Sequence, residues 1–400
     1  MRKHIVMLFI FMAIPVLIWG KGDKIKIGTI ITNQNYKQYI PAIKSMLPEG
    51  SHYWIINGIK KGWITIPLVQ REKNYPAPPG FAAATKKYAG VCKIGQNNEL
   101  IGHVAGIPFP DPKNGIELAW NCYSEIRRQC IEDDEFSSPF LLIDKNGDLE
   151  REFNMLLWKK KWTKRTDIEP IPQIPAGRKG LTSKESFVIN EPFDVKGFAQ
   201  VRIRYEALEK FDEVYSYIPA IRRIRRLTGS DLTDPLLGSD QMMDDFELWR
   251  QKITPKMTFK FSGVKEYLVP RTYTKKPPQP FIRHNLFQAE WETRDLYKLE
   301  VIMNDPDYAY SRRVIYASPE NNTYCLYYGE NYDQKGRLWR GDVLLVQATN
   351  PAVGARLWYG TLKVDHLTQH STVMDMYPSL KGMPVSQNNF TIKYLITKAR

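Results

Sequence analysis

Few side chains in this sequence have the types and the spacing that catalysis or metal binding requires. His366 and His370 are spaced like metal ligands, but no HExxH pattern surrounds them and a strand end is their expected context. The chain contains no GxSxG pattern for a hydrolase nucleophile, and its glycines form no GxGxxG or Walker-type pattern for a nucleotide phosphate. We therefore expect no enzymatic activity, no metal site and no cofactor.

The conspicuous polar feature is VYSYIPAIRRIRRLTG, residues 214–229, which is followed by the aspartates of residues 230–245. In a strand, Arg223 and Arg225 would point to one side and Arg222 and Arg226 to the other, so one pair would face the inside of a curved sheet. A buried guanidinium needs carboxylate or carbonyl partners. We interpret Arg223 and Arg225 either as part of an Arg–Asp network that holds the segment on the sheet or as a site for an anionic headgroup. A nucleic-acid contact is a third reading, weakened by the export signal described below.

Apolar residues gather in two further stretches. In VAGIPFPDPKNGIELAWN (104–121), prolines and glycines precede an amphipathic helix expected over residues 115–131, with Asp111 or Asn114 to cap it. The other stretch, residues 242–249, contains methionines, which are flexible apolar fillers. We expect these stretches, two tyrosines of the arginine block and a later tryptophan to line an apolar cavity: Ile107, Phe109, Trp120, Tyr123, Tyr215, Tyr217, Met242, Met243, Phe246, Trp249 and Trp339. The alternative for residues 104–121 is a plain strand-to-helix connection in the core.

The elements that must position these residues are mostly strands. Residues 198–206 alternate Val201 and Ile203 with Arg202 and Arg204, and similar patterns predict strands at 257–261, 296–303, 312–318, 323–330, 336–349, 356–365 and 389–396. Short connections between them indicate an antiparallel meander. Such a sheet either closes into a barrel or curls around helices or an apolar ligand. The N-terminal third differs: residues 35–47 and 53–61 are predicted helices, and Pro41 would kink or delay the first.

The first twenty residues indicate export. Arg2 and Lys3 precede an apolar run from Ile5 to Ile18, which is shorter than the roughly 20 residues of a transmembrane helix, and Gly20 offers a small residue for cleavage. No cysteine for a lipid anchor stands near this position. The chain has a formal net charge of +14, and in an exported protein the expected counterparts are anionic membrane surfaces rather than nucleic acid. Solubility alone is the alternative explanation.

The four cysteines do not form a disulfide scaffold in a chain of this length. Cys122 and Cys130 lie eight residues apart on the expected helix, about 12 Å along its axis, which is beyond the ~7 Å between Cα atoms that a disulfide spans. They are not expected to pair with each other. A bridge from Cys92 to one of them stays open.

Six blocks of the sequence resemble, in order, those of a known family. The blocks are GTIITNQNYKQYIPAIKSMLPEG (28–50), FAAATKKYAGVCKI (81–94), HVAGIPFPDPKNGIELAWN (103–121), VYSYIPAIRRIRRLTG (214–229), SDQMMDDFELW (239–249) and YDQKGRLWR (332–340). They resemble an uncharacterised family of exported Gram-negative proteins, commonly labelled outer-membrane lipoprotein-sorting-like and placed in the LolA/LolB-like superfamily. The first two blocks are similar to a longer subgroup.

The resemblance implies a mainly β (α+β) fold, in which a large curved antiparallel sheet forms an unclosed half-barrel with helices covering its opening. It also implies a periplasmic carrier of a lipid or another hydrophobic molecule, working with an inner-membrane exporter of the RND type and an outer-membrane acceptor, and it brings no catalytic residues. We expect a signal peptide at 1–20, a helical and loop-rich extension at 21–105 packed on the main domain, and the half-barrel at 106–400. The alternative function is a non-enzymatic scaffold or assembly factor that binds an outer-membrane or transporter protein; an exported hydrolase is the least supported.

Overall fold

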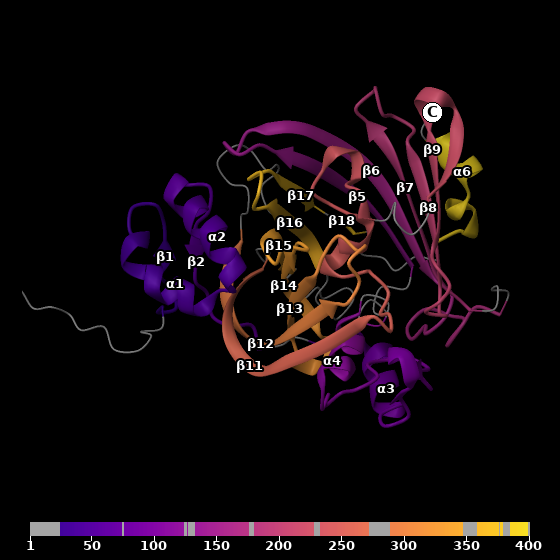
Figure 1. Cartoon of the computed structure of the whole chain (residues 1–400), viewed down its shortest axis with the longest axis horizontal. Helices are drawn as coiled ribbons and strands as arrows, with labels where there is room; N and C mark the ends of the chain where they lie inside the picture. The colour runs from indigo at the N-terminus through magenta and orange to yellow at the C-terminus, as the bar shows by residue number, and fades with distance from the viewer. Residues whose placement is uncertain are drawn as a thin grey trace, which may run out of the picture.

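The computed structural model is built around one large, strongly curved sheet (Figure 1). It describes residues 25–73, 76–123, 126, 133–175, 180–227, 233–271, 289–346, 358–375, 377–378 and 385–398. Along the sheet the strands are β10 (Arg223–Leu227), β9 (Glu213–Ile218), β8 (Ala199–Tyr205), β7 (Leu181–Glu191), β6 (Leu149–Lys161), β5 (Asp133–Ile143), β17 (Ser371–Asp375), β16 (Trp358–Asp365), β15 (Leu338–Val346), β14 (Cys325–Tyr332), β13 (Arg312–Ser318), β12 (Glu290–Met303) and β11 (Met257–Arg271). The short strand β18 (Tyr377–Pro378) pairs with β5.

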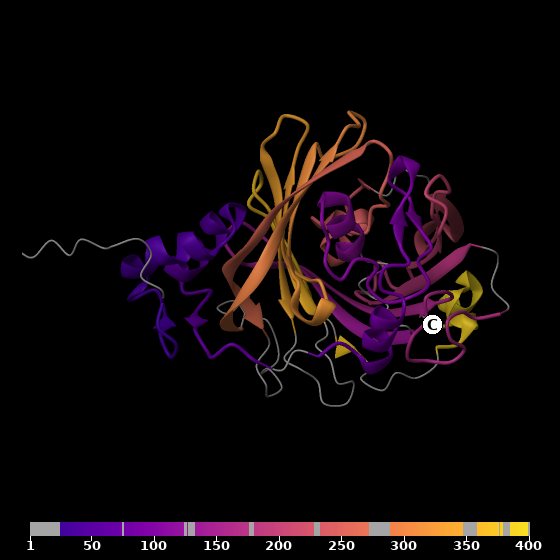
Figure 2. The ribbon, with the colours of Figure 1, turned by 90° about the horizontal axis from the view of Figure 1, so that it is seen from below.

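All of these neighbours pair antiparallel, and the sheet curves without closing into a barrel. One parallel pair, Arg271 with Val346, brings the end of β11 back against β15. Figure 2 shows the two arms of the sheet, β11–β16 on one side and β5–β10 on the other, facing each other across an interior that other segments fill. The predicted fold class, a curved antiparallel half-barrel, is confirmed.

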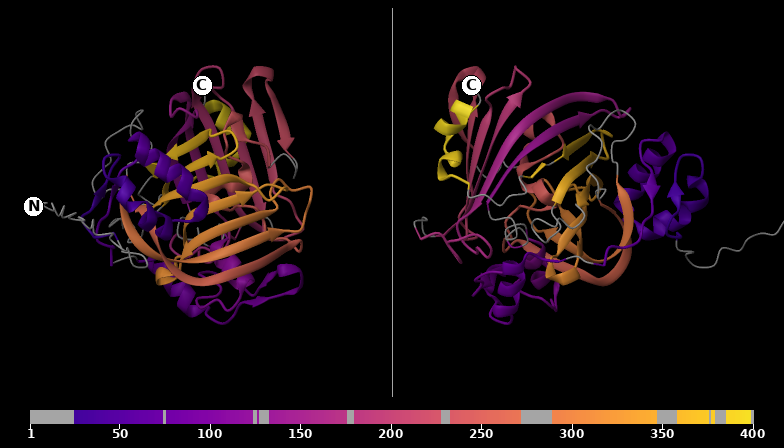
Figure 3. Two further views of the ribbon diagram at one scale, coloured as in Figure 1. Left: turned by 60° about the vertical axis from the view of Figure 1, so that its left-hand side comes forward. Right: turned by 180° about the vertical axis from the view of Figure 1, so that it is seen from behind.

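Two helices of the N-terminal part lie outside the sheet, against β11 and β15 (Figure 3). As expected, Pro41 delays the first: the 3₁₀ turn η1 (Tyr36–Tyr39) precedes α1 (Ile40–Met46), and α2 (Glu49–Lys61) follows. At the beginning of α2, the backbone N–H of Gly50 donates to Oε1 of Glu330 on β14 at 2.7 Å. A helix N-terminus favours a negative charge, so this contact fixes the helix on the sheet.

Short elements precede and follow α2 in the chain. They are β1 (Ile30–Ile31) paired with β2 (Ile66–Pro67), the helix α3 (Pro79–Lys87), and β3 (Lys93–Ile94) paired with β4 (Leu100–Ile101). Leu68, which directly follows β2, forms a bridge to Trp291 at the start of β12. No helix of the described ranges is long and apolar enough to cross a membrane, and the predicted signal peptide lies outside those ranges.

The helix α4 (Gly115–Cys122) begins at the predicted residue. Asn114 caps it by accepting a hydrogen bond from the N–H of Glu117 at 3.0 Å, and the Glu117 carboxylate accepts the N–H of Lys113 at 2.6 Å. A Cβ on Gly115 would lie 2.6 Å from the carbonyl oxygen of Phe259, so glycine allows the helix to touch β11. The predicted extent of 115–131 is wrong at Tyr123, whose backbone is extended. Residues 124, 125 and 127–132 lie outside the described ranges.

The C-terminal segment, residues 389–396, was predicted as a strand and is instead helical: η9 (Gln387–Phe390) is followed by α6 (Ile392–Lys398). Ser386 caps η9, and the apolar Ile392 and Leu395 stand three residues apart, on one face of a helix. That face covers an apolar cluster on the outside of β6, β7 and β8, which contains Trp158, Trp162, Val188, Ala199 and Val201. The outer face of this arm is therefore buried as well as the inner one.

The cap on α4 gives a first prediction. Asn114→Ala should lower the free energy of unfolding by ~1 kcal/mol, the usual cost of losing an N-cap, because the N–H of Glu117 loses its partner. Urea denaturation measures the difference. Asn114→Asp keeps an acceptor at the same position and should stay close to the wild type; an equal loss in both variants would contradict the role of the cap.

Candidate functional site

The inner face of the sheet is covered by residues 239–250, a segment that we call the plug. Every residue of the plug is buried, including the charged Asp240, Asp244, Asp245, Glu247 and Arg250. Its one helical element, η7 (Met243–Leu248), contacts β14 and β15 and is interrupted where Glu247 and Leu248 adopt positive φ angles of 57° and 72°. Residues other than glycine keep a positive φ angle only where the surrounding structure holds the backbone in place.

On the β11–β16 arm, the plug is held through Asp245. Its carboxylate lies 2.9 Å from Nη2 of Arg313 on β13 and 3.2 Å from Nζ of Lys363 on β16. It also accepts a hydrogen bond from the hydroxyl of Tyr310 at 2.6 Å. Burial opposes ionisation here, but Lys363 and Arg313 outweigh it and hold the pKa of Asp245 below its ordinary value. The surroundings therefore favour the ionised form of Asp245, and breaking a buried ion pair typically costs about 3–5 kcal/mol.

On the opposite arm, the plug is held by two arginines of β8. Arg202 donates from Nη1 to the carbonyl of Met243 at 3.1 Å, and its Nη2 lies 3.4 Å from Oδ1 of Asp244. Arg204 donates from Nη2 to the carbonyl of Arg250 at 2.8 Å. The plug thus ties the two arms of the open sheet together with charged contacts.

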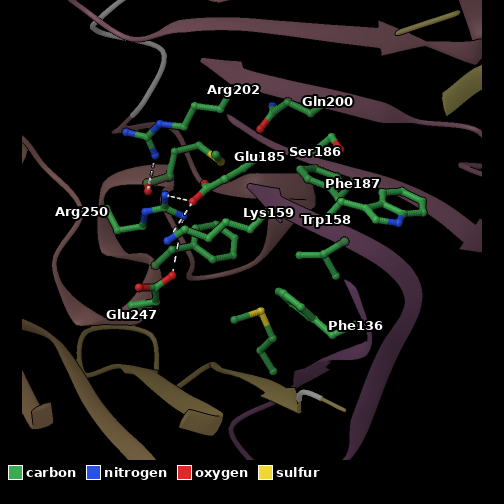
Figure 4. Close-up of a pocket in the computed structure, with 14 residues that line it drawn as sticks. Phe136, Trp158, Lys159, Glu185, Ser186, Phe187, Gln200, Arg202, Glu247 and Arg250 are labelled. Carbon is green, nitrogen blue, oxygen red and sulfur yellow. Dashed lines mark hydrogen bonds and ion pairs between the residues drawn. The ribbon is translucent and has the colours of Figure 1, made fainter. Parts of the chain in front are cut away.

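A pocket opens between the plug and strands β6 to β8 (Figure 4). Its volume is about 50 Å³, which leaves room for only a few water molecules. It is lined by Phe136, Leu157, Trp158, Lys159, Glu185, Ser186, Phe187, Gln200, Arg202, Met243, Phe246, Glu247, Arg250 and Met374. In Figure 4 the charged groups gather on one side, and the rings of Phe136 and Phe187 lie on the other.

The charged side of this pocket is an ion-paired group. Oε1 of Glu185 lies 3.4 Å from Nζ of Lys159, and it also accepts a hydrogen bond from Arg250. Arg250 in turn lies 3.8 Å from Glu247. The pocket therefore has one apolar and one charged wall, which suits a molecule with an apolar body and a polar end.

A second pocket, of about 300 Å³, lies where the end of α4 faces the ends of β7 and β8. Trp120 and Tyr123 line it together with Tyr205, Leu208 and Lys252. Burial lowers the pKa of Lys252 to about 8, although Asp212 favours its charged form. This volume lies at the lower end of the range for ligand pockets.

Several residues predicted for the cavity do lie beside these pockets. Met243 and Phe246 line the first and Trp120 and Tyr123 the second, while the Trp249 ring lies 6.2 Å from that of Tyr123 and so joins the plug to α4. Neither pocket is lined by the buried Ile107, Met242 and Trp249 or by the partly buried Phe109.

For Tyr215, Tyr217 and Trp339 the cavity prediction is wrong. Side chains alternate along β9, and its buried residues Val214 and Ser216 face inward, so the two tyrosines face outward. Tyr217 packs against the apolar cluster under α6. Trp339 lines neither pocket, and its indole N–H donates a hydrogen bond to the Asp365 carboxylate at 2.8 Å.

The arginine block is a hairpin at the edge of the sheet rather than one strand. A 3₁₀ turn, η4 (Pro219–Ile221), and a left-handed Arg222 separate β9 from β10. In β10 all the arginines are exposed, so the prediction that one pair faces the inside, within an Arg–Asp network, is wrong for Arg223 and Arg225. Aspartates of the segment that follows do pair with arginines, but those arginines come from β8 and β13 and not from the predicted block.

Sequence reasoning missed the charged wall of the first pocket. Lys159 and Glu185 belong to strands β6 and β7, which were not predicted. For Arg202 a signal existed, since residues 198–206 alternate, but alternation alone does not say which side faces inward. Cys92 is not disulfide-bonded within the described ranges, and Cys130 lies outside them.

His370 anchors the N-terminal end of the plug. Its Nδ1 lies 2.6 Å from Asp240, and its Nε2 lies 3.0 Å from Glu150. The Asp240 hydrogen bond, opposed by desolvation and aided by Glu150, raises the pKa of His370. Protonation therefore contributes stability that is complete below the ordinary histidine value of about 6.5 and is lost as pH rises through the raised pKa.

We predict that His370→Gln lowers the free energy of unfolding by up to ~1 kcal/mol at pH 6 and by less at pH 9, as expected of a partly exposed pair. Urea denaturation at both pH values measures this. His52→Gln, on the N-terminal helix α2, is the control. A loss that is the same at both pH values would contradict the charged pair.

Comparison with known proteins gives the family. An uncharacterized protein of Pseudomonas aeruginosa is 21% identical over 292 residues, which is 69% of this chain; the chain spans only 61% of that relative's length. A solved structure of a DUF1329 family protein from Desulfovibrio piger is 17% identical, with a TM-score of 0.48 over 67% of this chain and 94% of the other. A LolA superfamily protein from Nitrosomonas europaea is 13% identical, with a TM-score of 0.43 over 71% of this chain and 100% of the other. The model of the family "Protein of unknown function (DUF1329)" matches residues 30–395, and the chain therefore belongs to that family.

Proposed function

We propose that the protein is a periplasmic carrier for a lipid or another hydrophobic molecule, without enzymatic activity, that works with an RND-type exporter in transport to the outer membrane. The observation that supports this most directly is the pocket between the plug and the inner face of an unclosed sheet, with its apolar wall of Phe136, Phe187 and Phe246. The exporter and the outer-membrane acceptor enter the proposal from the family resemblance of the sequence blocks.

Apolar burial is sufficient to hold such a cargo. Each buried CH₂ group contributes about 0.8 kcal/mol, so a chain of moderate length is retained without specific contacts. The space beside Phe246 is only about 50 Å³, too small for an acyl chain in the arrangement observed. Loading therefore requires the plug to move away from the inner face, a displacement that an unclosed sheet allows.

We further propose that the β9–β10 hairpin contacts an anionic membrane surface when cargo is exchanged. Its exposed arginines flank Ile221 and Ile224, which are 59% and 57% exposed. Arginine near an anionic leaflet contributes about 1 kcal/mol per residue, and exposed apolar side chains can enter the headgroup region.

The carrier proposal predicts that protein purified under native conditions contains lipid. Extraction and mass spectrometry should find close to one lipid per chain. Phe136→Trp fills the first pocket and should reduce this amount severalfold, whereas Phe211→Trp, at a position 74% exposed, should not. A protein that is consistently empty but holds a tight protein partner would instead favour a scaffold or assembly factor.

The hairpin proposal predicts weaker membrane binding for Arg223→Glu/Arg225→Glu. The affinity for vesicles containing phosphatidylglycerol, measured by co-sedimentation, should fall at least tenfold. The melting temperature should not change, because both side chains are exposed. The matched control is Lys86→Glu/Lys87→Glu, which reverses the same charge on exposed residues of α3. An equal reduction in both double variants would mean that net charge, and not the hairpin, drives binding.

A further inference from the structure

The plug resembles an anionic amphiphile in its chemistry. Met243 and Phe246 present apolar side chains to the first pocket, while Asp244 and Asp245 present carboxylates to the strands. The plug also lies where cargo of the proposed carrier would have to lie, between the two arms of the sheet. What it contacts on the strands therefore indicates which cargo could replace it.

The strands offer the plug a surface rich in cations. The basic side chains that face it or the first pocket are Lys159, Arg202, Arg204, Arg313, Arg340 and Lys363. Acids outside the plug neutralise part of this charge. Asp342 lies 2.5 Å from Lys363, Glu185 lies 3.4 Å from Lys159, and Asp212 lies 2.8 Å from Arg202. The plug supplies further negative charge through Asp245, whose pKa is held low by Lys363 and Arg313, whereas burial raises the pKa of Asp244.

Displacement of the plug by a neutral molecule would separate these charges. Arg313 donates to the carbonyl of Leu248 as well as to Asp245, and its side chain has no exposure to solvent. Taking the plug away would remove both of these acceptors from a guanidinium that is fully buried in the observed arrangement, which is unfavourable unless another acceptor replaces them. A molecule that brings its own acid would restore the missing negative charge.

We propose that the cargo is an amphiphile with an anionic headgroup, a carboxylate or a phosphate, whose acid takes over from Asp244 and Asp245 as it displaces the plug. This inference rests on the proposed carrier function and adds the class of cargo to it. Arg202, Arg313 and Lys363 then serve both states of the protein, binding the plug when it is empty and the headgroup when it is loaded. The positive φ angles of Glu247 and Leu248 fit a segment held in place by these contacts.

The first test compares C16 probes that differ only in the headgroup. Palmitate and hexadecyl phosphate should bind the full chain, purified and stripped of lipid, about tenfold more tightly than 1-hexadecanol, the equivalent of ~1.4 kcal/mol. Hexadecyltrimethylammonium should bind more weakly still. The two anionic probes separate a carboxylate cargo from a phosphate cargo. Hydrogen exchange at the backbone amides of residues 239–250 should increase with either anion and stay unchanged with hexadecanol.

The second test weakens the plug. Asp245→Asn removes one negative charge that competes with the cargo, so palmitate should bind severalfold more tightly and should raise the melting temperature more than in the wild type. Asp194→Asn, at an acid 62% exposed and paired with Arg151, is the matched control and should bind as the wild type does. The probe comparison on the wild type remains decisive if Asp245→Asn folds poorly.

The outcomes separate the two proposals. If hexadecanol binds as tightly as palmitate, the protein remains a carrier and the anionic headgroup is refuted. If palmitate binds but exchange in residues 239–250 and the affinity of Asp245→Asn do not change, displacement of the plug is refuted. If none of the four probes binds, the carrier function fails together with this inference.

Discussion

Asp245 joins parts of the chain that are far apart in sequence, because its carboxylate is shared by Arg313, Lys363 and the hydroxyl of Tyr310. An open sheet would expose its inner face, with its apolar and its charged side chains, to water, and the plug is what covers that face. Buried charges add little net stability compared with apolar residues, but they tolerate few alternative arrangements. The ion pairs therefore hold the plug in one position although it is not a strand of the sheet. The shape of the inner pocket depends on that position.

The alternation of apolar and polar residues predicted many of the strands, but it did not predict which side chains face the inside of the sheet. Along residues 198–206 the alternation of apolar and basic residues correctly indicated a strand. An exposed sheet would turn Arg202 and Arg204 outward, yet here they are buried inward, and Val201 lies under α6. Both faces of this arm are covered, one by the plug and the other by the C-terminal helix. A pattern of period two cannot distinguish this arrangement from its reverse.

The candidate site was less predictable than the fold, for two physical reasons. Tertiary contacts decide which acid meets which base: the aspartates after the arginine block pair with Arg202 and Arg313 rather than with neighbouring arginines. Strands covered on both faces also lose the polar alternation that identifies them, as in MLLWKKK of β6, which supplies Lys159. The stretches carrying Trp120, Tyr123, Met243 and Phe246 could be found because aromatic residues and methionines are concentrated there.

The absence of obvious chemistry in the sequence and the abundance of buried charge in the structure have a common explanation in the carrier proposal. A carrier must hold its cargo and also release it, so the empty and the loaded states must be close in free energy. Apolar contacts alone favour loading with every added CH₂ group. Charged contacts that the plug and the cargo can make equally well cancel between the two states. The ion pairs at Asp245 would then decide which headgroup is accepted, while the apolar wall decides how strongly the cargo is held.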